Sequence, residues 1–143
     1  MMRVLFICLG NICRSPTAEA VARGKGISCD SAGTAGWHVG KPPYGPMQEA
    51  ASARSIDMAG LRARQLEPAD FDRFDLLIVM DEDNRRDAEA LRPAGNATQL
   101  ALLTAYGPAD QQGSPVPDPY FTRDFDGALD LIEECVDGLA EAL

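Results

Sequence analysis

The apolar and polar residues of this chain fall into short blocks that predict alternating strands and helices. Residues 4–7 and 75–80 are apolar runs typical of buried strands, and residues 27–31 and 99–103 indicate two further strands. Helices are predicted at residues 16–25, 47–56, 83–92 and 126–143, with Gly60 as the stop signal after the second. The alternation predicts one α/β domain over residues 1–143, a parallel sheet with helices on both faces.

The reactive residue types gather directly after the first strand. Five residues lie between Cys8 and Arg14, and Ser15-Pro16 then begins a helix with proline in its first turn. A loop at the carboxyl end of a parallel strand is where open α/β sheets bind ligands, and its N–H groups form a nest for an anion. Arg14 adds two coplanar donors, and the same field favours a thiolate at Cys8. The segment therefore predicts a phosphoryl-transfer site with a thiolate nucleophile.

Charge and cysteine usage narrow the function classes. The chain has 13 basic and 22 acidic residues, and a net charge of −9 argues against nucleic acid or an anionic membrane as partner. The first apolar run is too short for a signal peptide or a membrane span. Four cysteines without an export signal predict reduced thiols in the cytoplasm. A zinc site is not expected, because Cys8 and Cys13 have no second close pair and His38 stands apart.

Several motifs, in order along nearly the whole chain, resemble the low-molecular-weight protein tyrosine phosphatases, in particular bacterial members. They are Cys-Leu-Gly-Asn-Ile-Cys-Arg-Ser-Pro at 8–16, Asp-Ser-Ala-Gly at 30–33, Trp-His-Val-Gly at 37–40, Ala-Arg-Gln at 63–65, Met-Asp-Glu at 80–82 and Pro-Asp-Pro-Tyr at 117–120. The resemblance implies a four-stranded parallel sheet flanked by helices. It also implies hydrolysis of phosphotyrosine and small aryl phosphates without a metal or cofactor.

The resemblance assigns the catalytic roles residue by residue. Cys8 is expected to attack phosphorus and form a phosphocysteine, Arg14 to hold the phosphoryl oxygens, and Asp118 to protonate the leaving phenolate. Ser15 is expected to hydrogen-bond the Cys8 sulfur, and Asn11, supported by Ser31, to hold the loop in a left-handed-prone conformation.

The substrate is expected to lie between the loop and three aromatic side chains. The residues predicted to bind the substrate are Leu9, Gly10, Asn11, Ile12, Cys13, Ser15, Trp37, Tyr120 and Phe121. The resemblance also offers Cys13 as a disulfide partner that protects an oxidised Cys8, with ordinary loop packing as the alternative. Cys29 and Cys135 are expected to be core residues, and His38 to lie at the surface or rim. Leu61 stands where many relatives have a histidine behind the phosphate loop.

Three other functions remain open on these residues. Arsenate reductases share the fold but need more downstream thiols than Cys135 alone, and protein-arginine phosphatases carry threonine where this chain has Ile12. A phosphocysteine carrier or a phosphotyrosine-binding module would not need Asp118. The expected partners are phosphotyrosine-containing proteins, including a tyrosine kinase, with inorganic phosphate as product and the chain acting as a monomer.

Overall fold

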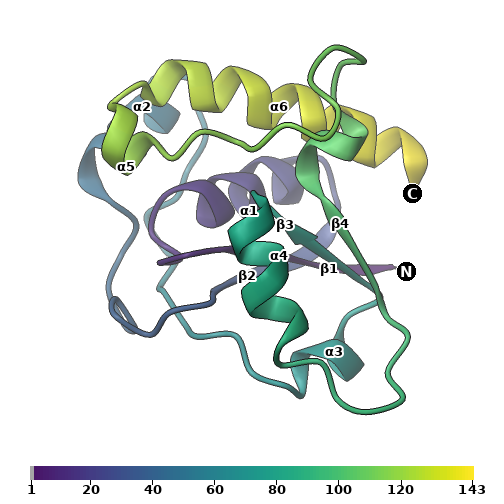
Figure 1. Cartoon of the computed structure of the whole chain (residues 1–143). Helices are drawn as coiled ribbons and strands as arrows, with labels where there is room; N and C mark the ends of the chain where they lie inside the picture. The colour runs from purple at the N-terminus through teal and green to yellow at the C-terminus, as the bar shows by residue number, and fades with distance from the viewer. Residues whose placement is uncertain (1) are drawn as a thin grey trace.

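Four parallel strands form the centre of the protein in the computed structural model, which describes residues 2–143. They are β1 (Arg3–Cys8), β2 (Ser28–Gly33), β3 (Leu76–Val79) and β4 (Gln99–Leu102), in the order β2-β1-β3-β4 (Figure 1). The register pairs Cys8 with Gly33 and Ile7 with Val79, so β1, β2 and β3 end at the same edge of the sheet. The predicted α/β class and parallel sheet are confirmed.

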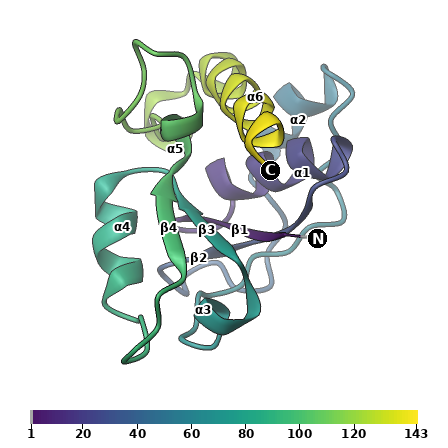
Figure 2. The same cartoon turned by 90° about the vertical axis from the view of Figure 1, so that its right-hand side faces the viewer.

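Helices cover both faces of the sheet, as Figure 2 shows. One face packs against α1 (Arg14–Gly24) and α6 (Phe125–Ala142), and α2 (Gly45–Ser52) packs against α6. The other face is covered by α3 (Asp70–Arg73) and α4 (Glu82–Glu89). Short turns of helix, η1 (Leu103–Tyr106) and α5 (Pro119–Thr122), lie between β4 and α6. Across residues 2–143, no helix is long and apolar enough to cross a bilayer.

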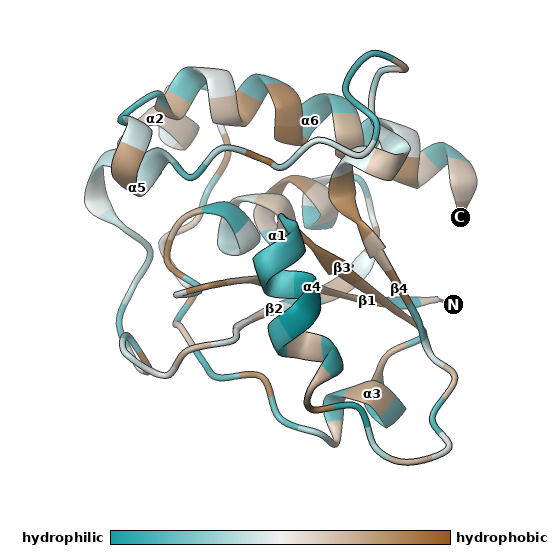
Figure 3. Cartoon of the chain, in the orientation of Figure 1, coloured by the Kyte–Doolittle hydropathy of each residue, from teal (hydrophilic) through white to brown (hydrophobic). Residues whose placement is uncertain are grey.

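The strand side chains alternate between two cores, as the period of a strand requires. Val4 and Phe6 face α1 and α6, whereas Leu5 and Ile7 face α3 and α4, and all four are fully buried. Burial on both faces explains why β1 and β3 are continuous apolar runs. In Figure 3 β1 and β3 are coloured mostly as hydrophobic, while α4 presents a hydrophilic surface. The central strand β1 therefore holds Cys8 at the end of a tightly packed element.

The second helix ends earlier than predicted. It stops at Ser52 and not at residue 56, so the prediction that Gly60 marks its end is wrong. Ser55 adopts a left-handed φ of 63°, its N–H donates to the Ser52 carbonyl, and the Ile56 N–H donates to the Ala51 carbonyl. This pair of bonds is a Schellman motif, which can end a helix without glycine when packing holds the strained residue. The short helices α3, η1 and α5 were also not predicted.

Candidate active site

The phosphate loop (residues 8–14) lies at the carboxyl edge of the sheet, where the strand order reverses between β1 and β3. The chain leaves β1 toward β2 on one side, and β3 lies on the other. At such a switch point a crevice forms outside the carboxyl ends of the strands, and open parallel sheets bind ligands in it. Helix α1 begins at Arg14, so its unpaired N–H groups and the positive end of its dipole meet the loop. This edge is therefore suited to an anion.

The Cys8 sulfur is buried and surrounded by hydrogen-bond donors. The Asn11 backbone N–H donates to Sγ at 3.3 Å, and Ser15 Oγ lies 3.0 Å from it. Ser15 Oγ also accepts a bond from Asn11 Nδ2 at 2.8 Å, so the hydroxyl proton of Ser15 is free to point to the sulfur. Two donors aimed at one sulfur stabilise a thiolate more than a thiol. The predicted contact between Ser15 and Cys8 is present.

Asn11 holds the phosphate loop through its backbone and its whole side chain. Its φ is 57°, the left-handed conformation predicted for it. Its Nδ2 donates to Ser15 Oγ and to Ser31 Oγ at 2.9 Å, and its Oδ1 accepts from the Arg64 backbone N–H at 3.0 Å. Leu61 instead packs in the apolar cluster beside the loop. The Asn11 amide is thus fully bonded without the histidine that many relatives are expected to use.

A buried carboxylate continues this network behind the loop. Ser31 Oγ donates to Glu19 Oε1 at 2.6 Å, and Glu19 pairs with Arg23 one turn further along α1. Burial raises the pKa of Glu19, while the bond from Ser31 and the charge of Arg23 oppose that rise. Glu19 was not predicted as a site residue, because a glutamate in an amphipathic helix is usually exposed. The chain of bonds therefore runs from α1 through β2 to Asn11.

Gly33 lets the loop lie directly on the end of β2. A Cβ atom placed there would come within 2.8 Å of the Leu9 carbonyl oxygen and 3.1 Å of the Asn11 nitrogen. Both neighbours are backbone atoms, which cannot rotate aside as a side chain could. The Gly33 carbonyl and N–H are themselves bonded to Leu66 and Arg64. Only glycine fits between the loop and the segment that follows.

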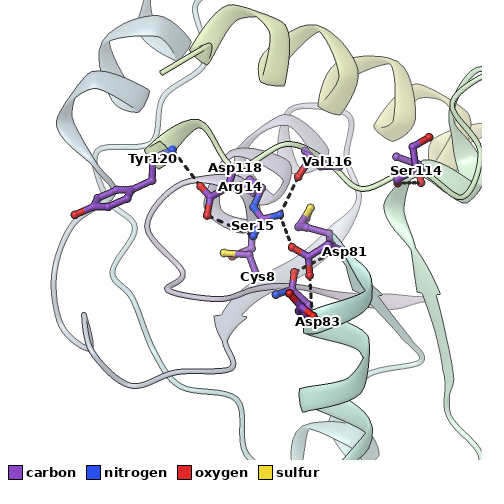
Figure 4. Close-up of polar contacts among 12 residues, drawn as sticks. Cys8, Arg14, Ser15, Asp81, Asp83, Ser114, Val116, Asp118 and Tyr120 are labelled. Atoms are coloured by element: carbon purple, nitrogen blue, oxygen red, sulfur yellow. Dashed lines mark hydrogen bonds and ion pairs between the residues drawn. The ribbon is translucent and has the colours of Figure 1, made fainter. Parts of the chain in front are cut away.

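Arg14 is 3% exposed and fixed from two sides (Figure 4). Its Nη1 donates to Asp81 Oδ2 and to the Val116 carbonyl, both at 2.8 Å, and its Nη2 lies 3.6 Å from Asp118 Oδ2. Burial would lower the pKa of Arg14, but the charge of Cys8, the bond to Asp81 and the charge of Asp118 outweigh it and raise the pKa. The guanidinium is therefore permanently charged and held in one orientation.

Asp81 and Val116 are two site residues without an assigned role in the sequence analysis. Asp81 lies two residues after the end of β3. It accepts the Asn84 N–H at 2.8 Å as the N-cap of α4 and uses its other oxygen for Arg14. Its place after a buried strand and inside the Met-Asp-Glu motif was a usable signal. Val116 contributes only its backbone carbonyl, and every residue type has one, so the sequence could not indicate this role.

The segment that carries Asp118 is tied to the sheet at its base. The Val116 N–H donates to the Met80 carbonyl at the end of β3 at 2.8 Å, and the buried Thr104 hydroxyl donates to the Ser114 carbonyl at 2.6 Å. Asp118 then caps α5, because its Oδ1 accepts the Tyr120 N–H at 3.1 Å. Its Oδ2 remains on the side of Arg14, as Figure 4 shows. The structure thus brings Asp118 to Arg14 across more than a hundred residues of sequence.

A cavity of about 180 Å³ opens above these groups. From the phosphate loop it is lined by Cys8, Leu9, Gly10, Ile12, Cys13 and Arg14. Around them lie Asp118, His38 and the three predicted aromatic residues, of which Trp37 is 70% and Phe121 72% exposed, with Tyr120 also exposed. Asn11 and Ser15 are buried behind the sulfur and support it there. The result is an apolar-rimmed slot with a thiol and a guanidinium inside it.

The remaining thiols differ from Cys8 in their surroundings. Burial, with the charges of Asp118 and Cys8, raises the pKa of Cys13 to about 12, so Cys13 is a thiol at neutral pH. Cys29 and Cys135 are buried core residues, as predicted, and burial raises their pKa values to about 12 and about 11. All four cysteines are free. Among the residues described here, no cluster of histidine, cysteine and carboxylate side chains could hold a metal ion.

Comparison with known proteins agrees with this geometry. The model of the low molecular weight phosphotyrosine protein phosphatases matches residues 3–143. The low molecular weight protein-tyrosine-phosphatase YfkJ of Bacillus subtilis is 41% identical over 142 residues, covering 93% of this chain and 90% of that protein.

Solved structures give the same result. The crystal structure of YfkJ superposes with a TM-score of 0.91 at 39% identity, covering 99% of this chain and 94% of the other. Wzb of Vibrio vulnificus, solved in complex with benzylphosphonate, superposes with a TM-score of 0.86 at 28% identity over 99% of both chains. With its phosphate loop, its parallel sheet and these relatives, the chain belongs to the low molecular weight protein tyrosine phosphatases, cysteine-dependent hydrolases of phosphotyrosine in proteins.

Proposed function

We propose that the protein hydrolyses phosphotyrosine through a phosphocysteine intermediate, with Cys8, Arg14 and Asp118 as its catalytic residues. The observation that carries the proposal is the convergence of these three side chains on one cavity with an aromatic rim. Any two of these side chains without the third would not support the proposal, because the reaction needs a nucleophile, a fixed positive charge and a proton donor together.

In the first step, the Cys8 thiolate attacks phosphorus in line with the bond to the tyrosine oxygen. The S–P bond forms as the P–O bond breaks, and Asp118 gives its proton to the departing phenolate. Oδ2 is the oxygen of Asp118 that faces the cavity side with Arg14, since Oδ1 already accepts the Tyr120 N–H. Arg14 and the loop N–H groups neutralise charge on the three equatorial oxygens, and the bonds to Asp81 and Val116 prevent reorientation during the step.

In the second step, water replaces the sulfur on phosphorus. The water oxygen bonds to phosphorus while Asp118, now a carboxylate, takes a proton from the water. The S–P bond breaks in the same step, which releases inorganic phosphate. Cys8 leaves as a thiolate, which Ser15 and the Asn11 N–H stabilise as a leaving group. The same two donors that make Cys8 nucleophilic therefore also speed its departure.

The aromatic rim supports a preference for phosphotyrosine. Trp37, Tyr120 and Phe121 stand at the mouth of the cavity, where a substrate ring would pass between them. A phosphoserine side chain is shorter and has no ring to contact these faces. Wzb, whose structure contains benzylphosphonate, binds an aryl-bearing phosphate analogue on the same fold, and we infer the same class of ligand for this chain.

The family implies phosphoproteins as substrates, and the finer biology is part of the proposal. We infer that a tyrosine kinase is among the partners, that the protein acts as a monomer in the cytoplasm, and that it uses no cofactor. The four free thiols support a reducing compartment. The acidic surface supports protein substrates over nucleic acid or anionic membranes.

The test is metal-free turnover together with capture of the intermediate. The wild type should hydrolyse an aryl phosphate and a phosphotyrosine peptide in the presence of a chelator, and leave phosphoserine and phosphoarginine peptides largely intact. Acid quenching during turnover should trap phosphate on Cys8, detected by peptide mass spectrometry. Cys8→Ser should lose turnover, while Cys135→Ala, which removes another buried thiol, should keep it. Phosphate on any other residue, or an active Cys8→Ser, would refute the mechanism.

A further inference from the structure

Tyr44 connects the phosphate loop to the segment that carries Asp118, although it lies outside the catalytic motifs. Its backbone N–H donates to the Ile12 carbonyl at 2.8 Å, directly within the phosphate loop. It is also the N-cap residue of α2, which begins at Gly45, and its ring packs beside the apolar cluster that contains Cys13. The position of Tyr44 is therefore set by the loop and by α2.

The same side chain contacts both ends of α5. Its ring lies 5.1 Å from the Tyr120 ring, centroid to centroid, at an interplanar angle of 53°. Its hydroxyl oxygen accepts a hydrogen bond from Arg123 Nη1 at 2.6 Å. Arg123 ends α5 in the left-handed conformation, with φ of 64°, and its guanidinium also lies over the Phe125 ring at 5.2 Å. Tyr44 thus contacts the first turn of this helix and Arg123, the residue that caps its C-terminus.

The acid segment (residues 117–123) has few other attachments. Helix α5 has four residues, too few to be stable alone, and within the segment Pro119 is the buried side chain while residues 120–123 are exposed. Figure 4 shows the Tyr120 ring extending from this segment on the side away from Arg14. Contacts from outside must therefore place the segment, and Tyr44 supplies two of them.

We propose that Tyr44 is a positioning residue that holds the acid segment over the phosphate loop. This inference rests on the proposed function, since it assigns to Tyr44 the placement of Asp118 and of the Tyr120 wall. Loss of the Tyr44 hydroxyl frees Arg123 and lets α5 shift, which moves Oδ2 of Asp118 from the leaving oxygen. It leaves Cys8 and Arg14 in place, because neither is bonded to the Tyr44 side chain.

The experiment compares Tyr44→Phe with the wild type on two leaving groups. For phenyl phosphate, whose phenolate needs a proton, the rate of phosphorylation should fall about three- to tenfold, the effect of one hydrogen bond acting through the acid. For an ester of a very acidic phenol, the pre-steady-state burst should stay within about twofold, since that leaving group departs without the acid. The inhibition constant of inorganic phosphate should also be unchanged. Tyr106→Phe, which removes a tyrosine hydroxyl in η1 outside the lining of the cavity, is the matched control.

A double-mutant cycle assigns the effect to the bond with Arg123. Arg123→Met alone should reproduce the leaving-group-dependent loss, and the double variant should be no slower than the slower single variant. Equal losses on both leaving groups, additive losses in the cycle, or wild-type rates in Tyr44→Phe would each overturn the positioning role. A wild type that does not hydrolyse aryl phosphates would refute the proposed function instead, so the two failures are distinguishable.

Discussion

Replacing Asn11 tests whether the loop conformation is held by side-chain bonds. The residue makes three side-chain hydrogen bonds, to Ser15, Ser31 and Arg64, in a left-handed backbone conformation. Each buried bond contributes about 1 kcal/mol net, so Asn11→Ala should lose about 3 kcal/mol. Alanine adds roughly 1 kcal/mol more because its Cβ disfavours the left-handed region. The sum, about 4 kcal/mol, is a large part of the roughly 5–15 kcal/mol by which domains are stable.

Asn11→Gly separates the two contributions. Glycine loses the same three bonds but adopts a positive φ freely, and it costs about 0.5–1 kcal/mol through the greater freedom of the unfolded chain. We therefore expect Asn11→Gly to be more stable than Asn11→Ala by up to about 0.5 kcal/mol, measured by urea unfolding. In both variants kcat/KM should fall by roughly 10- to 100-fold, because the donors to the Cys8 thiolate are no longer aligned.

Two results would refute this reasoning. An Asn11→Ala variant within about 1 kcal/mol of the wild type would mean that the loop is held by backbone packing alone. An Asn11→Gly variant less stable than Asn11→Ala would mean that the left-handed conformation imposes no cost at this position. Asn84→Ala is the control for the unfolding measurement, because it also removes a buried asparagine side chain, but one that lies in α4 and not in the phosphate loop.

Three further perturbations address other parts of the site. Arg14→Lys should lower kcat/KM far more than the free energy of unfolding, since lysine cannot bond the fixed acceptors and a phosphate in one plane; wild-type kinetics would remove Arg14 from the site. After mild peroxide and then dithiol, Cys13→Ser should recover less activity than the wild type. Since burial raises the pKa of Cys13 to about 12, the fraction of activity that the wild type recovers after peroxide should rise with pH. Equal recovery by Cys13→Ser and the wild type would mean that Cys13 only packs in the loop. Burial raises the pKa of Glu19, so its contribution to stability is complete below the unfolded value of 4.5 and is lost as pH rises through the folded value. Glu19→Gln should flatten that part of the curve of Tm against pH, and parallel curves would contradict the assignment.

The sequence predicted the site best where function requires a particular residue type at a fixed separation along the chain. Cys8, Arg14, Ser15 and Asn11 lie within eight residues, so a strand-loop-helix pattern was enough to bring them together. Asp118 lies far along the chain, and its place beside Arg14 came from the family resemblance rather than from local pattern.

The remainder depended on backbone atoms and on tertiary contacts. The Val116 carbonyl binds Arg14 whatever its side chain, and Ser55 ends α2 in a conformation that its residue type does not favour. Helix α5 has four residues and no periodicity to detect, so the role of Tyr44 beside it could be found only from the folded structure. These features arise from packing, which propensity and pattern do not encode.

The close approach at Gly33 has a consequence for how this protein can vary. Gly33 does not line the cavity and lies at the end of a strand, so by these two criteria alone small residues would be expected to be tolerated there. Even the Cβ of alanine would displace the Leu9 carbonyl and the Asn11 N–H. The Asn11 N–H is the donor that faces the Cys8 sulfur, so the substitution would disturb the nucleophile. Most tolerated substitutions near the site should therefore occur among the exposed residues of the cavity rim. Gly33, which lies beneath the phosphate loop, should tolerate substitution as poorly as Cys8 does.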